Sequence, residues 1–427
     1  MSPQASGQAA ASAAVEAAWR QEWGRLLGLL TGRFRDVTLA EDALADAFEA
    51  AARTWPDDGV PANPAAWLLT AARRRALDRL RGAETARRKL PLLVVDHVRE
   101  EERAEAEEMV DMALEQEMSD DELKLLFLAC HPALAPESQA ALALRLVLGV
   151  PTAEVARLFL VPEPTMAARL TRAKKKIATA GLPFAMPVDA ALPGRVAVVE
   201  QAIYLCFTAG YAPGVGDAVL RTDLADEAIR LARLLATLLS RRGGAPPSVI
   251  ALLALMVLQH ARRDARVGAG GELVLLADQD RARWHHDEIE DGLAMLRALP
   301  VLSGRAEELR LQAVIASRHA TAVHADDTDW PAIAGDYAVL ERLTGSPVVR
   351  LNRSVAVAEA DGPRAGLALL EGLETALPLS YRLPAVRGEL RARAGDRDAA
   401  REDFALAISR CGNEAEVTHL RARLASL

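Results

Sequence analysis

The chain has 427 residues, more than one hydrophobic core usually organises, so we expect more than one domain. Hydrophobic residues make up 51% of the chain and aromatic residues only 4%, and this mixture, dominated by alanine and leucine, favours helices over β-sheets. The net charge of −8 excludes a protein that coats nucleic acid over its whole surface, and permits only a local basic contact.

The cysteines and the apolar runs indicate the compartment. Cys130, Cys206 and Cys411 lie far apart without a CxxC pair, so we expect neither a disulfide framework nor a zinc site. No apolar run reaches the roughly 18 residues of a membrane-spanning helix, and the first residues lack the basic and apolar parts of a signal peptide. We therefore expect a cytoplasmic protein with no metal and no other cofactor.

The N-terminal part predicts helices with one acidic face. Residues 1–14 are small and uncharged, and we expect them to be disordered. The segment at 40–49 predicts a helix with Leu44, Ala47 and Phe48 facing inward, and a loop follows from Pro56. Its carboxylates are expected to face outward: Glu41, Asp42, Asp46 and Glu49.

Residues 61–89 predict an arginine-rich helix that carries one tryptophan. We expect Asn63 to cap it and Pro64 to occupy its first turn. A spacing of 100° per residue predicts a buried face of Ala65, Leu69, Ala72, Ala76 and Leu80, with Trp67, Arg74, Asp78 and Arg81 outward. An aromatic ring among guanidinium groups suits unstacked bases and phosphates. The candidate contacts are Trp67, Arg73, Arg74, Arg75, Arg79 and Arg81, unless Trp67 only packs against the preceding helix.

An acidic run from Glu100 to Glu108, interrupted by Arg103, predicts a solvated linker over residues 91–118. Beyond it, residues 152–177 predict a helix-turn-helix, with Thr152 as the first N-cap and Pro164 opening the second helix. In the second helix, Met166, Leu170, Ala173 and Ile177 form one apolar stripe. The other face presents candidate DNA contacts: Thr165, Arg169, Arg172, Lys174, Lys175 and Lys176.

The order and spacing of these segments closely resemble the sigma factors of bacterial RNA polymerase, in particular the extracytoplasmic-function class. AEDALADAFEAAARTW (40–55) is similar to the second conserved region, which grips the polymerase clamp. NPAAWLLTAARRRALDRLR (63–81) is similar to the adjoining part that melts and reads the minus-ten element, although Arg74 stands where the family commonly has asparagine. Residues 137–177 are similar to the fourth region, which reads the minus-thirty-five element.

The resemblance covers about residues 15–180, and it implies core RNA polymerase and promoter DNA as partners and no enzymatic activity. It implies that Arg169 and Arg172 read upstream bases and that Lys174, Lys175 and Lys176 contact phosphates. It also implies that the first acidic helix docks on the polymerase clamp through Glu41, Asp42, Asp46, Phe48 and Glu49.

The remaining residues predict helices broken by proline and glycine. Gly388, Gly395, Ala400, Phe404 and Ala407 have the spacing of a tetratricopeptide unit, and a similar pattern lies 34 positions earlier, at Ser354, Asp361, Gly366, Leu370 and Leu373. VVEQAIYLCFTAGY (198–211) and VVRLNRSVAVAEADGP (348–363) resemble a sigma subgroup with a long helical extension, although Thr208-Ala209 replace its Asn-Glu. In that subgroup the Asp361-Gly362-Pro363 turn is expected to be needed for activity.

The predicted fold is therefore all-α, with helical domains at 15–90 and 119–182, the acidic linker between them, and an extension at 183–427 whose repeats occupy about 320–427. Two alternatives remain open. One is a helix-turn-helix regulator with a repeat sensor that acts without docking on polymerase. The other is an enzyme or metal site within the extension, built on Asp278, Asp280, His285, His286, Asp287 and Glu288. The extension could bind an activator, inhibit the DNA readers or aid docking on polymerase.

Overall fold

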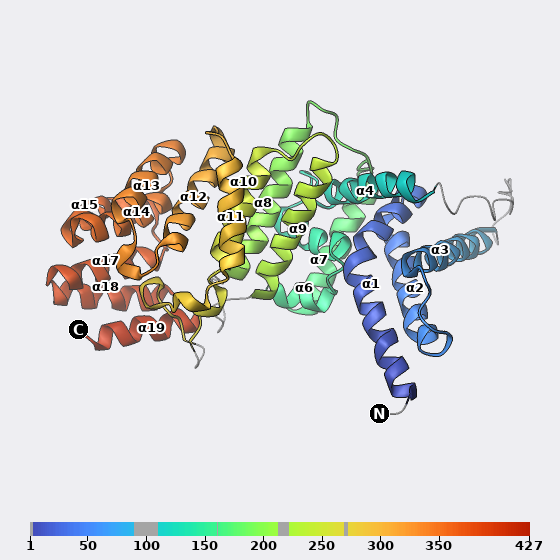
Figure 1. The fold of residues 1–427 in the computed structure, drawn as a ribbon, viewed down its shortest axis with the longest axis horizontal. Helices are drawn as coiled ribbons and strands as arrows, with labels where there is room; N and C mark the ends of the chain where they lie inside the picture. Colours follow the sequence, from blue (N-terminus) through green and yellow to red (C-terminus); the bar gives the residue numbers. More distant parts are fainter. Residues whose placement is uncertain (1–2, 89–109, 160, 212–221, 269–271) are drawn as a thin grey trace. The chain divides into compact units, whose positions relative to one another are not determined.

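The computed structural model describes residues 3–88, 110–159, 161–211, 222–268 and 272–427, which form helices joined by turns (Figure 1). Among these residues the only β pairing is an isolated bridge between Val267 and Leu273. The all-α prediction is confirmed. The chain divides into two compact units, Met1–Ala202 and Ile203–Leu427.

The first unit begins with a long helix. We expected disorder over residues 1–14, but helix α1 starts at Pro3, because this stretch is rich in alanine, the strongest helix former. The predicted linker is also partly helical, since α4 begins at Val110, and residues 89–109 lie outside the described part of the chain. The helices are α1 (Pro3–Phe34), α2 (Val37–Asp58), α3 (Pro64–Arg88), α4 (Val110–Ala129), α5 (Pro136–Leu142), a π-helical turn (Ala143–Val147), α6 (Thr152–Leu158) and α7 (Glu163–Thr179), and α8 (Leu192–Tyr211) continues into the second unit.

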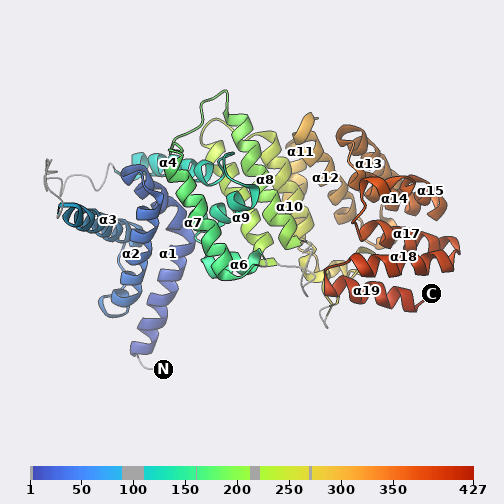
Figure 2. The same cartoon turned by 180° about the vertical axis from the view of Figure 1, so that it is seen from behind.

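Helix α2 is fixed at both ends by its own sequence. The Asp36 carboxylate accepts hydrogen bonds from the backbone N–H groups of Thr38 and Leu39, at 2.9 and 3.1 Å, which satisfies two of the free donors of the first turn. The predicted break at Pro56 comes three residues later, at Gly59, whose φ of +86° favours glycine. Helices α1 and α2 run side by side (Figure 2).

Glycines allow α1 to approach the helices that precede the helix-turn-helix. Gly24, Gly28 and Gly32 lie four positions apart and therefore share one face of α1. A Cβ atom at Gly28 would lie 2.8 Å from the backbone carbonyl carbon of Asp121 in α4, and one at Gly24 would collide with the carbonyl oxygen of Val147. Only glycine fits at such a close approach of two backbones.

The second unit is built around α10, an almost entirely buried helix that packs against α9, α11 and α12. A helix that is apolar on all sides belongs at the centre of a helical layer. The helices are α9 (Thr222–Ser240), α10 (Pro247–His260), α11 (His286–Ala298), α12 (Gly304–Thr321), α13 (Trp330–Thr344), α14 (Pro347–Asp361), α15 (Pro363–Leu370), α16 (Leu373–Ala376), α17 (Arg382–Ala394), α18 (Arg397–Arg410) and α19 (Glu414–Ala425).

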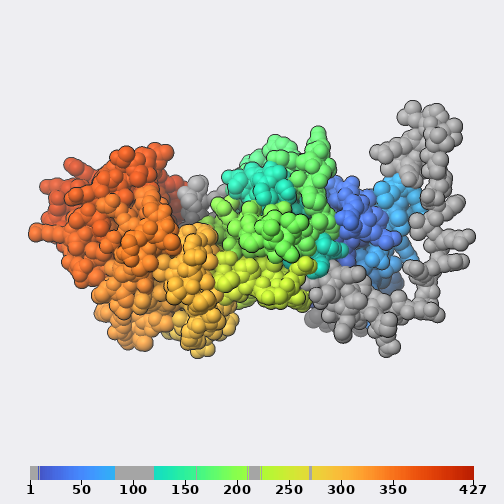
Figure 3. Space-filling model, turned by 90° about the horizontal axis from the view of Figure 1, so that it is seen from above, coloured from blue at the N-terminus to red at the C-terminus, as the bar shows by residue number. Residues whose placement is uncertain are grey.

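The last helices of this unit pack in sequence order, α14 on α15, α15 on α17 and α17 on α18, and their atoms form one continuous orange-to-red block in the space-filling view (Figure 3). A Cβ at Gly366 of α15 would lie 2.6 Å from the Ser354 carbonyl oxygen of α14. At the positions 34 residues later, a Cβ at Gly388 would lie 3.3 Å from the Ala400 carbonyl oxygen. The same helix crossing therefore occurs twice. In the first crossing the glycine is on the second helix, α15, and in the second crossing it is on the first helix, α17.

Candidate nucleic-acid interface

Helix α3 begins as predicted, because the N–H of Ala66 donates to Asn63 Oδ1 at 3.0 Å. Its buried face agrees with the predicted one at Ala72 and Ala76 but not at Leu69 and Leu80. Leu68, rather than Leu69, is fully buried together with Ala72 and Ala76, whereas Leu80 is 41% exposed. The prediction was wrong at these positions because helices α1 and α2, not the average helical spacing, decide which side of α3 is covered.

Trp67 does not point freely into solvent. Its ring packs edge-on against Trp55 of α2, with the centroids 5.6 Å apart, and the side chain is half-buried. The alternative that Trp67 packs against the preceding helix is therefore correct for this structure. Part of the ring remains accessible beside the arginines.

The arginines of α3 form an exposed basic surface. Arg73, Arg74 and Arg75 are all exposed; Arg74 lies opposite the buried alanines, and Arg73 and Arg75 flank them. Desolvation and the nearby charge of Arg33 lower the pKa of Arg73 from its ordinary value. The guanidinium of Arg73 nevertheless keeps its charge throughout the physiological range, and Arg33 is a second positive charge nearby.

A predicted DNA contact of α3 pairs with two predicted polymerase contacts of α2. Arg79, a candidate DNA contact, pairs with Asp42 at 3.1 Å and with Asp46 at 2.8 Å, both on α2. These carboxylates were expected to meet the polymerase. Arg81 is exposed and lies 3.6 Å from Asp78 on its own helix.

Helices α6 and α7 form the predicted helix-turn-helix, apart from Leu160 of the turn, which lies outside the described residues. The N-cap is Pro151 rather than Thr152, and α7 starts at Glu163, one residue before Pro164. The predicted apolar stripe of α7 is confirmed, because its buried residues are Met166, Leu170, Ala173 and Ile177.

The opposite face of α7 carries polar and basic side chains. Thr165, Arg172 and Lys175 are exposed, and Arg169 is half-buried. Arg169, Arg172 and Lys176 line a cavity of about 290 Å³, and Lys176 donates to the backbone carbonyl of Ala133. The loop before α5 thus orients one end of this basic surface.

Glu41 and Lys174 contradict their predicted orientations. Glu41 was expected to face outward but is 5% exposed. Its carboxylate accepts from Arg145 Nε at 2.7 Å and from Lys174 Nζ at 2.9 Å. Lys174, a candidate phosphate contact, is therefore held by α2. Because α2 and α7 meet through these charges, the Glu41 carboxylate, which was predicted to face outward, forms an internal ion pair.

An aromatic cluster surrounds this ion pair. Trp19 Nε1 donates to the Gly149 carbonyl at 2.8 Å, and the Arg145 guanidinium lies 5.1 Å from the centre of the Trp23 ring. Phe48 was also proposed as a polymerase contact, but it is 2% exposed and packs against Trp19 with centroids 4.8 Å apart. Of the predicted acidic face, Asp42 and Glu49 are exposed and Asp46 is half-buried.

Sequence reasoning missed Arg145, Trp19 and the glycines of α1. Arg145 lies in an apolar stretch, so nothing in its neighbourhood indicates a buried carboxylate partner 104 positions away. The four-residue spacing of Gly24, Gly28 and Gly32 was a visible signal for close helix packing, and it was not used.

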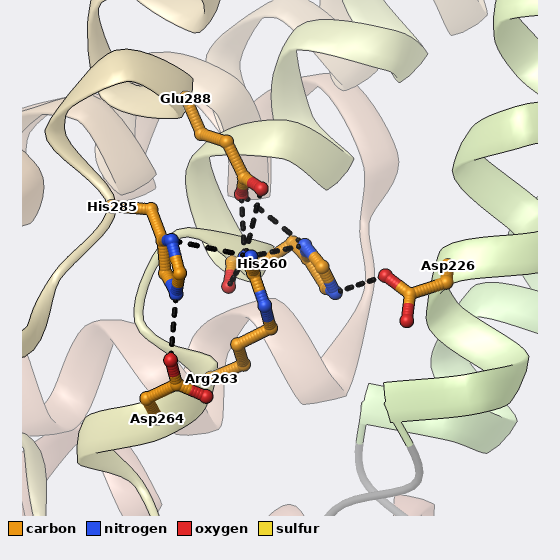
Figure 4. A network of polar contacts seen from close by, with 6 residues as sticks. All are labelled: Asp226, His260, Arg263, Asp264, His285 and Glu288. Carbon is orange, nitrogen blue, oxygen red and sulfur yellow. Dashed lines mark hydrogen bonds and ion pairs between the residues drawn. The ribbon is translucent and has the colours of Figure 1, made fainter. Parts of the chain in front are cut away.

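The histidine-rich cluster of the extension forms a closed polar network (Figure 4). His285 Nε2 lies 2.8 Å from Asp264, and Glu288 contacts both His260, at 3.2 Å, and Arg263, at 2.8 Å. His260 also lies 3.0 Å from Asp226. These side chains bind one another, so the network ties α9, α10 and α11 together.

The network also shifts the ionisation of its members. Burial opposes the charged form of His260, but the hydrogen bonds to Asp226 and Glu288 outweigh it and raise the pKa of His260. Burial would raise the pKa of Glu288, but its bonds to His260 and Arg263 lower it. Both shifts favour a charged pair, as expected for a structural ion network.

Asp361, Gly362 and Pro363 form the junction between α14 and α15. Gly362 has φ +93° and ψ 161°, a conformation that is essentially restricted to glycine, and its N–H donates to the Ala358 carbonyl at 3.1 Å. Pro363 starts α15, the favoured position for proline. The motif therefore acts as a rigid corner between two packed helices.

The part of the chain that the structure describes contains neither a metal-binding cluster nor a membrane-spanning helix. No group of three or more histidine, cysteine, aspartate or glutamate side chains is arranged to hold a metal ion. No described helix combines the length and apolar character needed to cross a membrane.

Three segments of the chain match models of protein families. Residues 19–85 match sigma-70 region 2, and residues 124–177 match sigma-70 region 4. Residues 195–299 match a family of unknown function, DUF6596, and this segment contains the network of Figure 4. The chain is also similar to the uncharacterized protein R00370 of Rhizobium meliloti (strain 1021), with 41% identity over 400 residues that cover 93% of this chain and 92% of that protein.

Proposed function

We propose that this protein is a sigma factor of the extracytoplasmic-function class. The chain belongs to the same family as the Rhizobium meliloti protein. Its sigma-70 regions 2 and 4 make it a promoter-recognising sigma factor. Its partners are core RNA polymerase and promoter DNA. We place its action in the cytoplasm, with the clamp of the polymerase as the docking site for region 2.

Region 4 reads the upstream promoter element through α7. The observation that carries this proposal is the division of α7 into a fully buried apolar stripe and an opposite face with Thr165, Arg169 and Arg172. Arginine side chains on such a face reach guanine edges in the major groove, and Lys175 and Lys176 neutralise phosphates.

Region 2 holds the separated strand on α3. Arg73, Arg74 and Arg75 supply exposed positive charge, and the accessible part of Trp67 supplies a stacking surface. One base stacked on an aromatic side chain contributes roughly 1–3 kcal/mol, so binding of the separated strand favours the melted state without nucleotide hydrolysis.

The described arrangement of regions 2 and 4 is a closed state that must open before both regions bind DNA. An ammonium group that is paired with a buried carboxylate is not available to a phosphate, and Lys174 is paired with Glu41 in this way. Within region 2, Arg79 of α3 pairs with Asp42 and Asp46 of α2 at the surface, so docking of polymerase on these carboxylates competes with Arg79. Docking on core polymerase supplies the competing contacts that separate the two regions.

The extension is a regulatory or protein-interaction module with tetratricopeptide-like repeats over about residues 320–427. The repeated crossing of α14 on α15 and of α17 on α18 supports this proposal. So do two ion pairs that each join residues 34 positions apart: Glu359 of α14 pairs with Arg393 of α17, and Glu389 of α17 pairs with Arg423 of α19. Solenoids of this type bind peptides or partner helices.

In vitro transcription with purified core polymerase tests the function. We expect promoter-specific initiation at genomic promoters that are enriched with the protein. If no such promoter is transcribed and the protein does not co-purify with core subunits, the chain acts as a helix-turn-helix regulator and the sigma proposal fails.

Removal of the extension tests its role separately. A chain that ends after residue 183 retains regions 2 and 4, the segments that carry the DNA and polymerase contacts. Increased transcription relative to the full chain identifies the extension as an inhibitor, and lost transcription with retained promoter binding identifies it as a required element. Unchanged transcription contradicts a regulatory role.

A further inference from the structure

A cavity of about 520 Å³ lies in the second unit, between the segment that follows α10 and the helices α12, α13 and α14. Its volume is within the range of small-molecule sites. Segments far apart in the sequence contribute to it, from Arg262 to Arg382. The cavity is distinct from the network of Figure 4 and from every residue proposed above to contact DNA or polymerase.

The cavity wall combines positive charge with apolar surface. Arg262, Arg266 and Arg382 line it, and no acidic side chain is among the described residues of its wall. The apolar part consists of Leu273, Val274, Leu275, Leu276, Val355 and Ala356, together with the rings of Trp330 and Tyr337.

Two buried polar atoms in the wall have no hydrogen-bond partner. Gln279 is 8% exposed, and its Nε2 donates to the Val274 carbonyl, which leaves Oε1 unsatisfied. His319 Nδ1 is also buried without a partner. Because buried polar atoms in native proteins are nearly always bonded, unsatisfied atoms in the wall of a cavity indicate a missing ligand or water.

The environment of His319 keeps this residue of the wall uncharged. Burial, together with the charges of Arg262 and Arg281, lowers the pKa of His319 to about 4. The imidazole is therefore neutral at physiological pH and offers one donor or acceptor, while the guanidinium groups carry the charge.

From this combination we infer that the cavity binds a small organic anion, with a carboxylate or phosphate group held by the arginines and an apolar or aromatic body packed against Trp330 and the leucines. His319 Nδ1, when it carries the ring proton, can donate to the anionic group, whereas Gln279 Oε1 is an acceptor and requires a donor on the body of the ligand or a water. The bound ligand contacts helices α12, α13 and α14 and therefore stabilises the extension. The activity of the sigma factor then depends on the concentration of this small molecule.

The probe is 1-anilinonaphthalene-8-sulfonate, an aromatic anion, titrated calorimetrically into the full chain. We expect one site per chain. The double variant Arg266→Gln/Arg382→Gln should weaken binding at least about tenfold, since a hydrogen bond to a charged group contributes roughly 1.5–3 kcal/mol. Arg397→Gln, an exposed arginine of α18 outside the cavity, is the matched control and should bind as the original chain does.

A second variant distinguishes loss of the binding site from misfolding of the double arginine variant. Asn352→Trp adds bulk at an exposed position of the wall, leaves all arginines in place and should also abolish binding. Competition separates the anion types, because inorganic phosphate displaces the probe if the site prefers phosphate and benzoate does so if it prefers a carboxylate. Probe binding that neither anion displaces, that both variants retain, or that is absent overturns the inference.

Discussion

Lys174 of α7 donates to the carboxylate of Glu41 in α2 at 2.9 Å, although the two residues lie 133 positions apart. The same carboxylate accepts from Arg145 at 2.7 Å. One buried glutamate thus holds two cations of region 4, and it keeps a lysine of the recognition helix away from solvent. We therefore expect DNA phosphate to compete with Glu41 for Lys174.

Glu41→Gln should open the contact. A neutral amide leaves Arg145 and Lys174 close together with no counter-charge, and loss of one partner of a buried ion pair destabilises a structure by about 3–5 kcal/mol. We expect a lower urea midpoint for the first unit and tighter binding of region 4 to promoter DNA. Glu49→Gln, an exposed glutamate on the same helix, should change neither quantity. Equal midpoints and affinities for both variants would show that the contact does not control region 4.

Gly28→Ala tests the close approach of α1 and α4. The added Cβ would lie 2.8 Å from a backbone atom of Asp121, which cannot rotate away as a side chain can. Overpacking of this kind destabilises by roughly 1–3 kcal/mol. Chemical denaturation should show the loss, whereas Gly194→Ala, at a helical position with no neighbour within 4 Å, should be neutral or slightly stabilising. A Gly28 variant as stable as the Gly194 variant contradicts the close packing.

Arg169→Ala should remove sequence preference at the upstream element. A good bidentate contact to a base contributes about 1–3 kcal/mol of discrimination, so mutated and native upstream elements should become nearly equivalent in binding assays. Lys175→Ala, on the same exposed face, should weaken all sequences alike and reduce the salt dependence. If Arg169→Ala weakens all sequences uniformly, Arg169 is a phosphate contact.

His319→Gln should alter the pH dependence of stability in the acid range. The folded-state pKa is about 4 and the ordinary value is 6.5, so the unfolded chain binds a proton between these values when the folded chain does not. Stability from the neutral imidazole is therefore complete above pH 6.5 and declines as the pH falls towards 4. The effect is at most about 3 kcal/mol, and the variant should lack it. Parallel stability profiles for both proteins from pH 7 to about 4 would refute this assignment.

The candidate site was predictable wherever local rules apply. Asn63 caps α3 and the stripe of Met166, Leu170, Ala173 and Ile177 is buried, because capping and helical spacing depend on neighbouring residues. The predicted orientation of Glu41 was wrong, because cations distant in sequence cover it, and of the two alternatives for Trp67 the structure has the contact with the preceding helix. The roles of the DNA-binding and polymerase-binding residues remain predictions.

The sequence by itself determined the helices, their caps and corners and the order of the two DNA-reading segments, since backbone hydrogen bonding, propensity and periodicity act over a few residues. Only the tertiary structure decided which charges meet. The same carboxylate on α2 is consistent with polymerase docking or with an internal ion pair, and the approach of α1 to α4 through glycines brings Arg145 and Lys174 to it. Electrostatic partners depend on distance in space, which periodicity along one helix does not specify.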